Sequence, residues 1–412
     1  MAFPATMVIL PVGTLFILSG LIVNLIQILS FAGYSLCVCS SNIKILLQKN
    51  KQIANRITMV GTHMSRRLVG RRQGLHFHRF YVNSFSCVEL YADSETFQLL
   101  GKENALLICN HRSDIDWLIG WVLAQRAGCL GSTVAMMKKE VKYLPVIGWS
   151  MWFAEFLFLE RNWEKDEAAL KSGFKQLEHK PVPFWVALFV EGTRFTHAKL
   201  LAAQEFAISR GMPVPKNVLI PRTKGFVTTV KETRKYIPAI YDCTFIVPKN
   251  EPSPTLLRIF KGIPCSVKVQ FKRHRVEELP EKEDGIAQWC KDAFVAKDAL
   301  LEQYNTTEIF SELELHEMRR PKRSLFVVAC WSSFLGFLLV KFFQWSSLLS
   351  TWHGIFFTVI FMVIVTIVME ILIHASQAEH SKSNNLSTNL PIQDPIKQRL
   401  LHSDITKHVP IA

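Results

Sequence analysis

Apolar positions are concentrated at the two ends of the chain. Residues 1–43 carry no charged side chain, and Lys341 is the only charged residue between Arg323 and Glu370. A helix needs about 20 consecutive apolar residues to cross a bilayer. We therefore expect an N-terminal membrane segment over 1–43, as one helix or a helix pair. We also expect a C-terminal transmembrane hairpin over 319–374, for which a buried core hairpin is the alternative.

Between these zones, short β-prone runs alternate with amphipathic helical patterns. This alternation predicts an α/β fold with a mostly parallel sheet flanked by helices. The predicted strands are 105–109, 132–136, 156–159, 184–190, 218–220, 236–247 and 265–272, and the predicted helices are 115–126, 163–179, 198–210 and 282–303. In such sheets ligands bind beyond the carboxyl ends of the strands, so candidate site residues are sought there.

The charge distribution places these parts relative to a membrane. The 412 residues carry a net charge of +14, and nine Lys and Arg residues follow the first apolar zone before the first carboxylate, Glu89. The positive-inside rule then puts the middle of the chain on the cytosolic side. The predicted parts are the membrane segment, a basic juxtamembrane lead-in over 44–104, a cytosolic domain over 105–318, the hairpin, and a flexible polar tail over 375–412.

Composition excludes several classes of protein. The nine cysteines are scattered and include no C-x-x-C pair, which argues against a disulfide framework. The basic residues flank the apolar zones and form no patch interleaved with aromatic residues, so nucleic acid is not an expected partner. The expected partners are membrane lipids, and the sequence indicates no particular protein partner.

The first candidate loop, Asn110–Asp116, follows the predicted strand 105–109. It places His111 directly after the strand and Asp116 in the first turn of the next helix. Asp116 could then accept a hydrogen bond from one imidazole nitrogen, which leaves the other nitrogen available to take a proton. The alternative is a helix capping box formed by Ser113 and Asp116, which requires no catalytic role.

Two other loops offer cationic groups at strand ends. Gly192 allows close approach of the backbone, and Arg194 presents a planar guanidinium that matches a phosphate. The segment Ile220–Pro221 runs from an apolar stretch into basic residues, as the wall of an apolar channel would. Taken singly, each loop is also compatible with an ordinary surface turn. Further positive charge near strand ends comes from Lys139 and Arg161.

The combination of these loops favours one type of chemistry. The chain has no G-x-S-x-G elbow, no zinc-ligand spacing and no Walker loop. A histidine base, several cations and a membrane anchor suit the deprotonation of a hydroxyl group on an anionic lipid. That hydroxyl would attack an activated acyl group without a covalent acyl-enzyme.

Four sequence blocks in this order resemble those of the glycerolipid acyltransferase family: HRSDID, FLFLER, VEGTR and LIPRTKGF, all within 110–226. The stretch from Glu191 to Phe226 is most similar to the eukaryotic 1-acylglycerol-3-phosphate acyltransferases, especially the plant endoplasmic-reticulum type. One difference lies just before the second block, where many relatives have glycine and this chain has Glu155.

The resemblance implies a reaction and a role for each residue. His111 would remove the proton from the sn-2 hydroxyl of lysophosphatidate, Asp116 would orient His111, and acyl-CoA would supply the acyl chain, giving phosphatidate. No metal and no cofactor besides the co-substrate acyl-CoA are implied. The phosphate would be bound by Arg194 with Lys139 and Arg161, in a site shaped by Glu191, Gly192 and Thr193, and the acyl-CoA side would be lined by Pro221 and Ile220.

Three alternatives remain open from the sequence. The acceptor could be another lysophospholipid or glycerol 3-phosphate, the protein could be an inactive membrane scaffold, or it could hydrolyse acyl groups. The resemblance and the lipid chemistry imply a multi-pass protein of the endoplasmic reticulum membrane, with its catalytic domain in the cytosol.

Overall fold

The computed structural model describes residues 87–113, 115–143, 148, 151–152, 154–160, 162–248, 251, 254–255, 258, 263, 266–310, 312–318, 333–334, 336–338, 340–346, 348–364 and 367. The predicted N-terminal membrane segment and the polar tail lie outside these residues, as does most of the basic lead-in. Those predictions therefore stay predictions.

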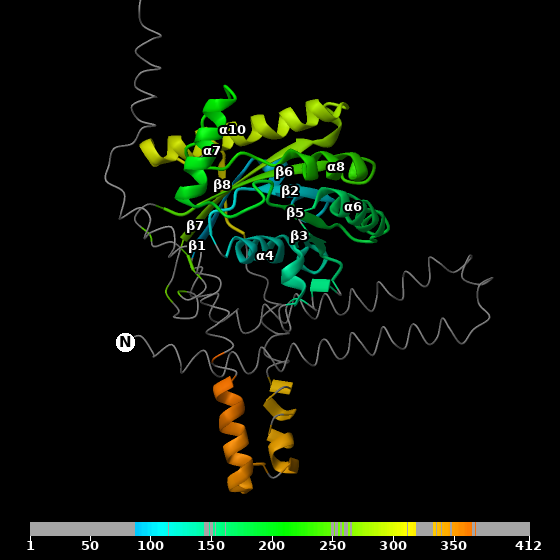
Figure 1. Cartoon of the computed structure of the whole chain (residues 1–412), viewed down its shortest axis with the longest axis vertical. Helices are drawn as coiled ribbons and strands as arrows, with labels where there is room; N and C mark the ends of the chain where they lie inside the picture. Colours follow the sequence, from blue (N-terminus) through cyan, green and yellow to red (C-terminus); the bar gives the residue numbers. More distant parts are fainter. Residues whose placement is uncertain are drawn as a thin grey trace, which may run out of the picture.

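The described part of the chain is built on an eight-stranded mixed sheet in the order β4-β3-β5-β2-β6-β7-β1-β8 (Figure 1). All neighbouring strands are parallel except the pairs β6/β7 and β1/β8. The α/β fold with a mostly parallel sheet is thus confirmed. The strands are β1 (Cys87–Ala92), β2 (Ala105–Cys109), β3 (Val134–Lys138), β4 (Leu157–Leu159), β5 (Trp185–Leu188), β6 (Ala239–Ile246), β7 (Ser266–Arg275) and β8 (Glu314–His316).

The central strand β2 determines where the loops gather. Every residue of β2 is buried, and the strand pairs in parallel with β5 on one side and with β6 on the other. Parallel neighbours have their carboxyl ends at the same edge of the sheet. The loops after β2 and β5, which contain His111 and Arg194, therefore start side by side.

Helices cover both faces of the sheet (Figure 1). On one face, α4 packs into one apolar core, and on the other, α6, α8 and α10 pack into a second core. The helices are α3 (Ser94–Leu99), α4 (Asp116–Ala127), α6 (Trp163–Leu177), α7 (His197–Ser209), α8 (Thr223–Thr233) and α10 (Glu283–Thr307).

Helix α10 shows how the spacing of apolar residues in the sequence determines which side of a helix packs on the sheet. Its buried residues recur every three or four positions, so they form one stripe along the helix: Ile286, Cys290, Phe294, Lys297, Leu301 and Tyr304. Within this stripe, Lys297 donates hydrogen bonds to Asp242 and Thr244 and to the carbonyl oxygen of Cys243. A buried ammonium group with these partners is not left unpaired, and it fixes α10 to β6.

Two predicted elements differ from the structure. The predicted strand 218–220 is wrong, because these residues belong to no strand, and the backbone N–H groups of Val218 and Leu219 donate to side chains. The N–H groups of Asn217 and Val218 donate to Asp298 on α10, and that of Leu219 donates to Glu191. Helix α8 begins directly afterwards, where the sequence pattern predicted only a loop.

The sheet also extends upstream of the predicted start of the cytosolic domain at residue 105. Strand β1 lies within the predicted basic lead-in and pairs in parallel with β7. On its other side, β1 pairs with the short antiparallel strand β8. The segment before residue 105 therefore contributes directly to the sheet.

In the C-terminal apolar zone, residues 340–346 and 352–364 are helical. Large apolar side chains are exposed along them, including Trp345 at 83% and Trp352 at 86%. No helix within the described residues is both long enough and apolar enough to cross a bilayer. The transmembrane hairpin stays a prediction.

Candidate functional site

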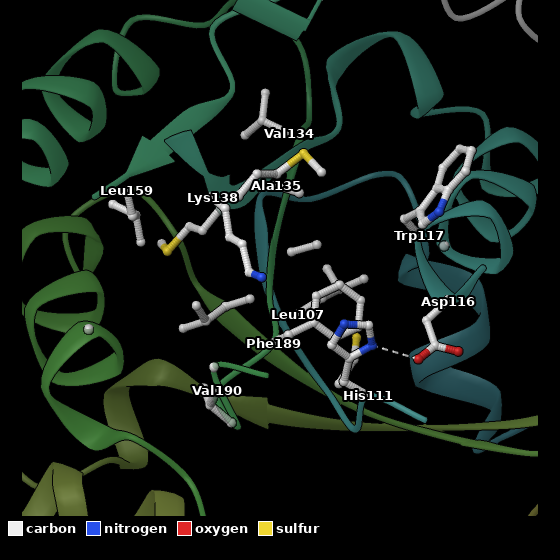
Figure 2. Close-up of a pocket in the computed structure, with 18 of the residues that line it drawn as sticks. Leu107, His111, Asp116, Trp117, Val134, Ala135, Lys138, Leu159, Phe189 and Val190 are labelled. Carbon is white, nitrogen blue, oxygen red and sulfur yellow. Dashed lines mark hydrogen bonds and ion pairs between the residues drawn. The ribbon is translucent and has the colours of Figure 1, made fainter. Parts of the chain in front are cut away.

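A cavity of about 810 Å³ opens at the carboxyl ends of β2, β3 and β5 (Figure 2). His111 and Asp116 line it together with residues of two different kinds. One part of the lining is apolar and includes Leu107, Trp117, Ala135, Ala187 and Phe189. Another part carries the cationic side chains of Lys138, Arg194, Arg222 and Lys224.

The loop after β2 brings His111 and Asp116 into contact. Nδ1 of His111 lies 2.8 Å from Oδ2 of Asp116. The same oxygen accepts hydrogen bonds from the backbone N–H groups of Arg112 at 2.7 Å and Ser113 at 2.9 Å. Asp116 thus holds both the backbone, as in the capping alternative, and the imidazole. Since a carboxylate oxygen accepts, Nδ1 carries the hydrogen, and in the neutral imidazole Nε2 then has the lone pair.

His111 and Asp116 differ in solvent exposure. Asp116 is only 3% exposed, whereas the side chain of His111 is 24% exposed and reaches the cavity. The imidazole packs on Phe189 at the end of β5, with ring centroids 4.5 Å apart. The ring is therefore held from two sides while its free edge faces open space.

Glu191 connects three loops from inside the protein. Its carboxylate accepts the backbone N–H of His111 at 2.9 Å and that of Leu219 at 3.2 Å, and the residue is 2% exposed. Burial raises the pKa of Glu191 from its ordinary 4.5 to about 8, against the opposing effect of the two N–H donors. Glu191 is not among the described residues that line the cavity. It therefore positions the loop of His111 from the protein interior.

Gly192, Thr193 and Arg194 all line the cavity. Gly192 has a φ of 67°, a conformation that favours glycine, and a Cβ atom there would lie 2.9 Å from Cδ of Arg222, so a larger residue would displace that side chain. Lys199 on α7 donates to the hydroxyl of Thr193 at 2.8 Å and to the carbonyl oxygen of Arg194 at 3.1 Å. Arg194 is 9% exposed.

The remaining predicted site residues lie elsewhere. Lys139 forms an ion pair with Glu160 and is not part of the described cavity lining, whereas its neighbour Lys138 extends into the cavity (Figure 2). Ile220 and Pro221 are half-buried and are likewise outside the described lining. Arg161 lies outside the described residues.

Before the second block, Glu155 has a φ of 60°. This left-handed conformation is one that glycine adopts easily and that other residues adopt rarely.

Comparison with known proteins identifies the family. The acyltransferase family model matches residues 88–247, and the acyltransferase C-terminus model matches residues 258–331. The chain is 49% identical over 403 residues to 1-acyl-sn-glycerol-3-phosphate acyltransferase 3 of Arabidopsis thaliana, which covers 97% of this chain and 100% of the relative. The chain belongs to the glycerolipid acyltransferase family.

Other members of the family are similar over most of their length. The chain is 51% identical over 384 residues to 1-acyl-sn-glycerol-3-phosphate acyltransferase 2 of Brassica oleracea, covering 92% of this chain and 93% of the relative. It is 34% identical over 341 residues to 1-acyl-sn-glycerol-3-phosphate acyltransferase gamma of Homo sapiens, covering 82% of this chain and 80% of the relative. The resemblance read from the four blocks is thus confirmed for the family.

Asn110, Lys138 and Lys199 are among the residues of the site that were missed in the sequence. The buried Asn110 accepts the N–H of Phe245 at 2.8 Å and donates to its carbonyl oxygen at 3.0 Å, which anchors the loop to the end of β6. Lys138 lines the cavity, and Lys199 holds the loop of Arg194. Asn110 and Lys138 each stand next to a predicted site residue, which is the only signal the sequence offers for them.

Within the described residues, no group of three or more His, Cys, Asp or Glu side chains converges as metal ligands.

The raised pKa of Glu191 predicts a pH-dependent stability. A carboxyl group with a folded pKa of about 8 and an unfolded pKa near 4.5 contributes stability that is complete below pH 4.5 and lost as the pH rises through 8. In Glu191→Gln, one backbone N–H faces an amide N–H in place of an acceptor, which costs about 1–3 kcal/mol. The melting temperature of wild type should therefore fall relative to that of Glu191→Gln as the pH rises from 5 to 9.

Purified protein in detergent serves for this measurement, with thermal unfolding followed at each pH. Glu205→Gln, which changes an exposed carboxylate on α7, is the matched control and should leave the melting curves unchanged. A wild-type melting temperature that stays constant or rises relative to that of Glu191→Gln toward pH 9 would contradict the raised pKa.

Proposed function

We propose that the protein transfers an acyl chain from acyl-CoA to the sn-2 hydroxyl of 1-acylglycerol 3-phosphate (lysophosphatidate), which makes phosphatidate. The observation that carries the proposal is the contact of His111 with Asp116 in a cavity that also contains cationic and apolar walls. The names of the plant relatives, aligned over 97% and 92% of this chain, support the same acceptor.

In the proposed reaction His111 acts as the general base. Nε2 takes the proton of the sn-2 hydroxyl while the hydroxyl oxygen attacks the thioester carbonyl carbon, and a positioned base contributes about 10²–10⁴-fold. The new C–O bond forms as the C–S bond breaks, and the proton on His111 passes to the departing CoA sulfur. No covalent acyl-enzyme is formed, and Asp116 keeps Nδ1 protonated throughout.

The phosphate of the acceptor would be bound on the cationic side of the cavity. Arg194 ranks first because guanidinium binds phosphate in a bidentate manner. Lys138 and Arg222 line the same cavity, and the first turn of α8 adds backbone N–H groups and the positive end of its dipole. Lys139 and Arg161 stay predicted contributors. Pro221 and Ile220 stay a prediction for the acyl-CoA side.

The protein is proposed to be a multi-pass protein of the endoplasmic reticulum membrane with a cytosolic catalytic domain. Support comes from the uncharged residues 1–43, the apolar zone before Glu370, and the basic residues that follow or precede these zones. An acceptor and a product that are both membrane lipids fit an anchored enzyme. The flexible polar tail over 375–412 has no proposed role.

Replacement of the base tests the function directly. The purified wild-type protein should form phosphatidate from lysophosphatidate and oleoyl-CoA, and His111→Ala should lower the rate by about 10²–10⁴-fold. Expression and membrane insertion should be unaffected, because the side chain is partly exposed in a cavity. Turnover near wild type would contradict the role of His111.

A panel of acceptors in the same assay separates the alternatives. Preferred turnover of glycerol 3-phosphate or of another lysophospholipid would replace lysophosphatidate as the acceptor. Release of free fatty acid would indicate a hydrolase, and no turnover of any acceptor would indicate a scaffold.

The role of Arg194 predicts a selective change in substrate binding. Loss of a hydrogen-bonded ion pair costs about 1.5–3 kcal/mol, so Arg194→Ala should raise the KM for lysophosphatidate by about 10- to 100-fold. The KM for acyl-CoA should change little. Arg210→Ala, an exposed arginine outside the described lining, is the matched control. Equal increases in both KM values would argue against phosphate binding by Arg194.

A further inference from the structure

One apolar part of the cavity lies against the face of the sheet that α4 covers, while other apolar lining residues, such as Leu170 and Phe226, belong to the core on the opposite face. In β3, Val134 and Met136 are buried while Ala135 and Met137 are only half-buried. In β5, Ala187 is half-buried between buried neighbours. Successive strand residues point to opposite faces, so these half-buried residues share the face that α4 covers. Their exposure inside a sheet means that open space lies between them and α4.

The floor of this space is continuous across three strands. Ala135 of β3 is the register partner of Ala187 of β5, and Ala187 is the register partner of Leu107 of β2. All three residues line the cavity. Because Ala135 and Ala187 are partners on adjacent strands and both side chains are short, the sheet leaves a groove beneath α4. Larger residues at these positions would fill that space.

The opposite wall is formed by α4. Trp117, Gly120 and Trp121 line the cavity, and the two indole rings contact each other at a centroid distance of 4.9 Å. Gly120 is four residues after Asp116, so the two residues lie on the same side of the helix one turn apart. The groove therefore starts at the catalytic pair and runs along α4.

Gly120 leaves this wall open. A Cβ atom built on Gly120 meets no heavy atom within 4 Å. Glycine in a helix interior is less stable than alanine, and here neither a positive φ nor a close contact requires it. What the missing side chain provides is room beside the two tryptophans.

We propose that Gly120 is a specificity-determining residue that makes room for the fatty-acyl chain of the acyl-CoA donor. This inference rests on the proposed function. The reacting carbonyl must lie at His111, so the chain attached to that carbonyl is the one that enters a groove starting there. The groove walls named above are alkyl and aromatic side chains without a charged group, which suit a hydrocarbon chain better than a phosphate.

The test compares donor chain lengths in Gly120→Leu and wild type, with lysophosphatidate as acceptor. A leucine would project into the groove one turn beyond Asp116. We expect kcat/KM for oleoyl-CoA to fall by about 10- to 100-fold, as for a misfit of one or more methylene groups, while kcat/KM for butyryl-CoA changes much less. Gly120→Ala should fold at least as well as wild type and show a smaller shift in the same direction.

The matched control is Gln125→Leu, which places the same side chain on α4 at a position outside the described cavity lining. It should keep the wild-type chain-length profile. The melting temperatures of all variants show whether each is folded.

Each outcome separates the inference from the proposed function. A Gly120→Leu profile parallel to that of wild type overturns the inference. A selectivity change that follows the acyl chain of the lysophosphatidate, and not that of the donor, also overturns it. If wild type transfers no acyl chain from any donor to lysophosphatidate, the proposed function fails first.

Discussion

A single carboxylate oxygen of Asp116 accepts three hydrogen bonds, from the imidazole of His111 and from the backbone N–H groups of Arg112 and Ser113. Because Asp116 is 3% exposed, water competes little for these donors. The bonds set both the path of the loop and the orientation of the ring. A histidine held in this way presents Nε2 to the cavity with its lone pair free, which is the property that a general base requires.

The position of this loop depends on the sheet and on a second buried carboxylate. β2 lies between parallel partners, so the loops after β2 and β5 begin at the same edge. Glu191 then joins the N–H of His111 to that of Leu219, and the carbonyl oxygen of His111 accepts the N–H of Phe195 at 2.7 Å. Three segments far apart in the sequence are thereby fixed around one cavity. His111 and the cationic side chains both line this cavity.

Much of this arrangement could be predicted from the sequence. β2 was predicted with its observed bounds because its apolar run is buried on both faces, and the four blocks identified the loops. Helix α8 was missed because Pro221, Arg222 and Gly225 are typical of a turn, although the buried Phe226 and Val230 follow a helical spacing. The strand at 218–220 was wrongly predicted because its N–H groups bond to distant carboxylates that no local pattern reveals.

The assignment of Lys139 shows where prediction from sequence stops. β3 begins at Val134, two residues later than predicted, and neighbouring strand residues point to opposite faces. Lys138 ends the strand and lines the cavity, whereas Lys139 begins the turn that follows and pairs with Glu160, so the position of the strand end decides which lysine reaches the cavity. The space beside Gly120 is equally hidden, because it depends on the side chains of β3 and β5 that the fold brings beneath α4.

The most direct measurement of the central claim is the turnover of Asp116→Asn with lysophosphatidate and oleoyl-CoA. An asparagine keeps the size of the side chain but offers an N–H group in place of one carboxylate oxygen, so His111 is no longer held with Nδ1 protonated. A loss of about 10³- to 10⁴-fold in kcat, with the protein still folded, is the predicted result. A kcat within a few-fold of wild type would contradict the role of the His111–Asp116 pair in catalysis.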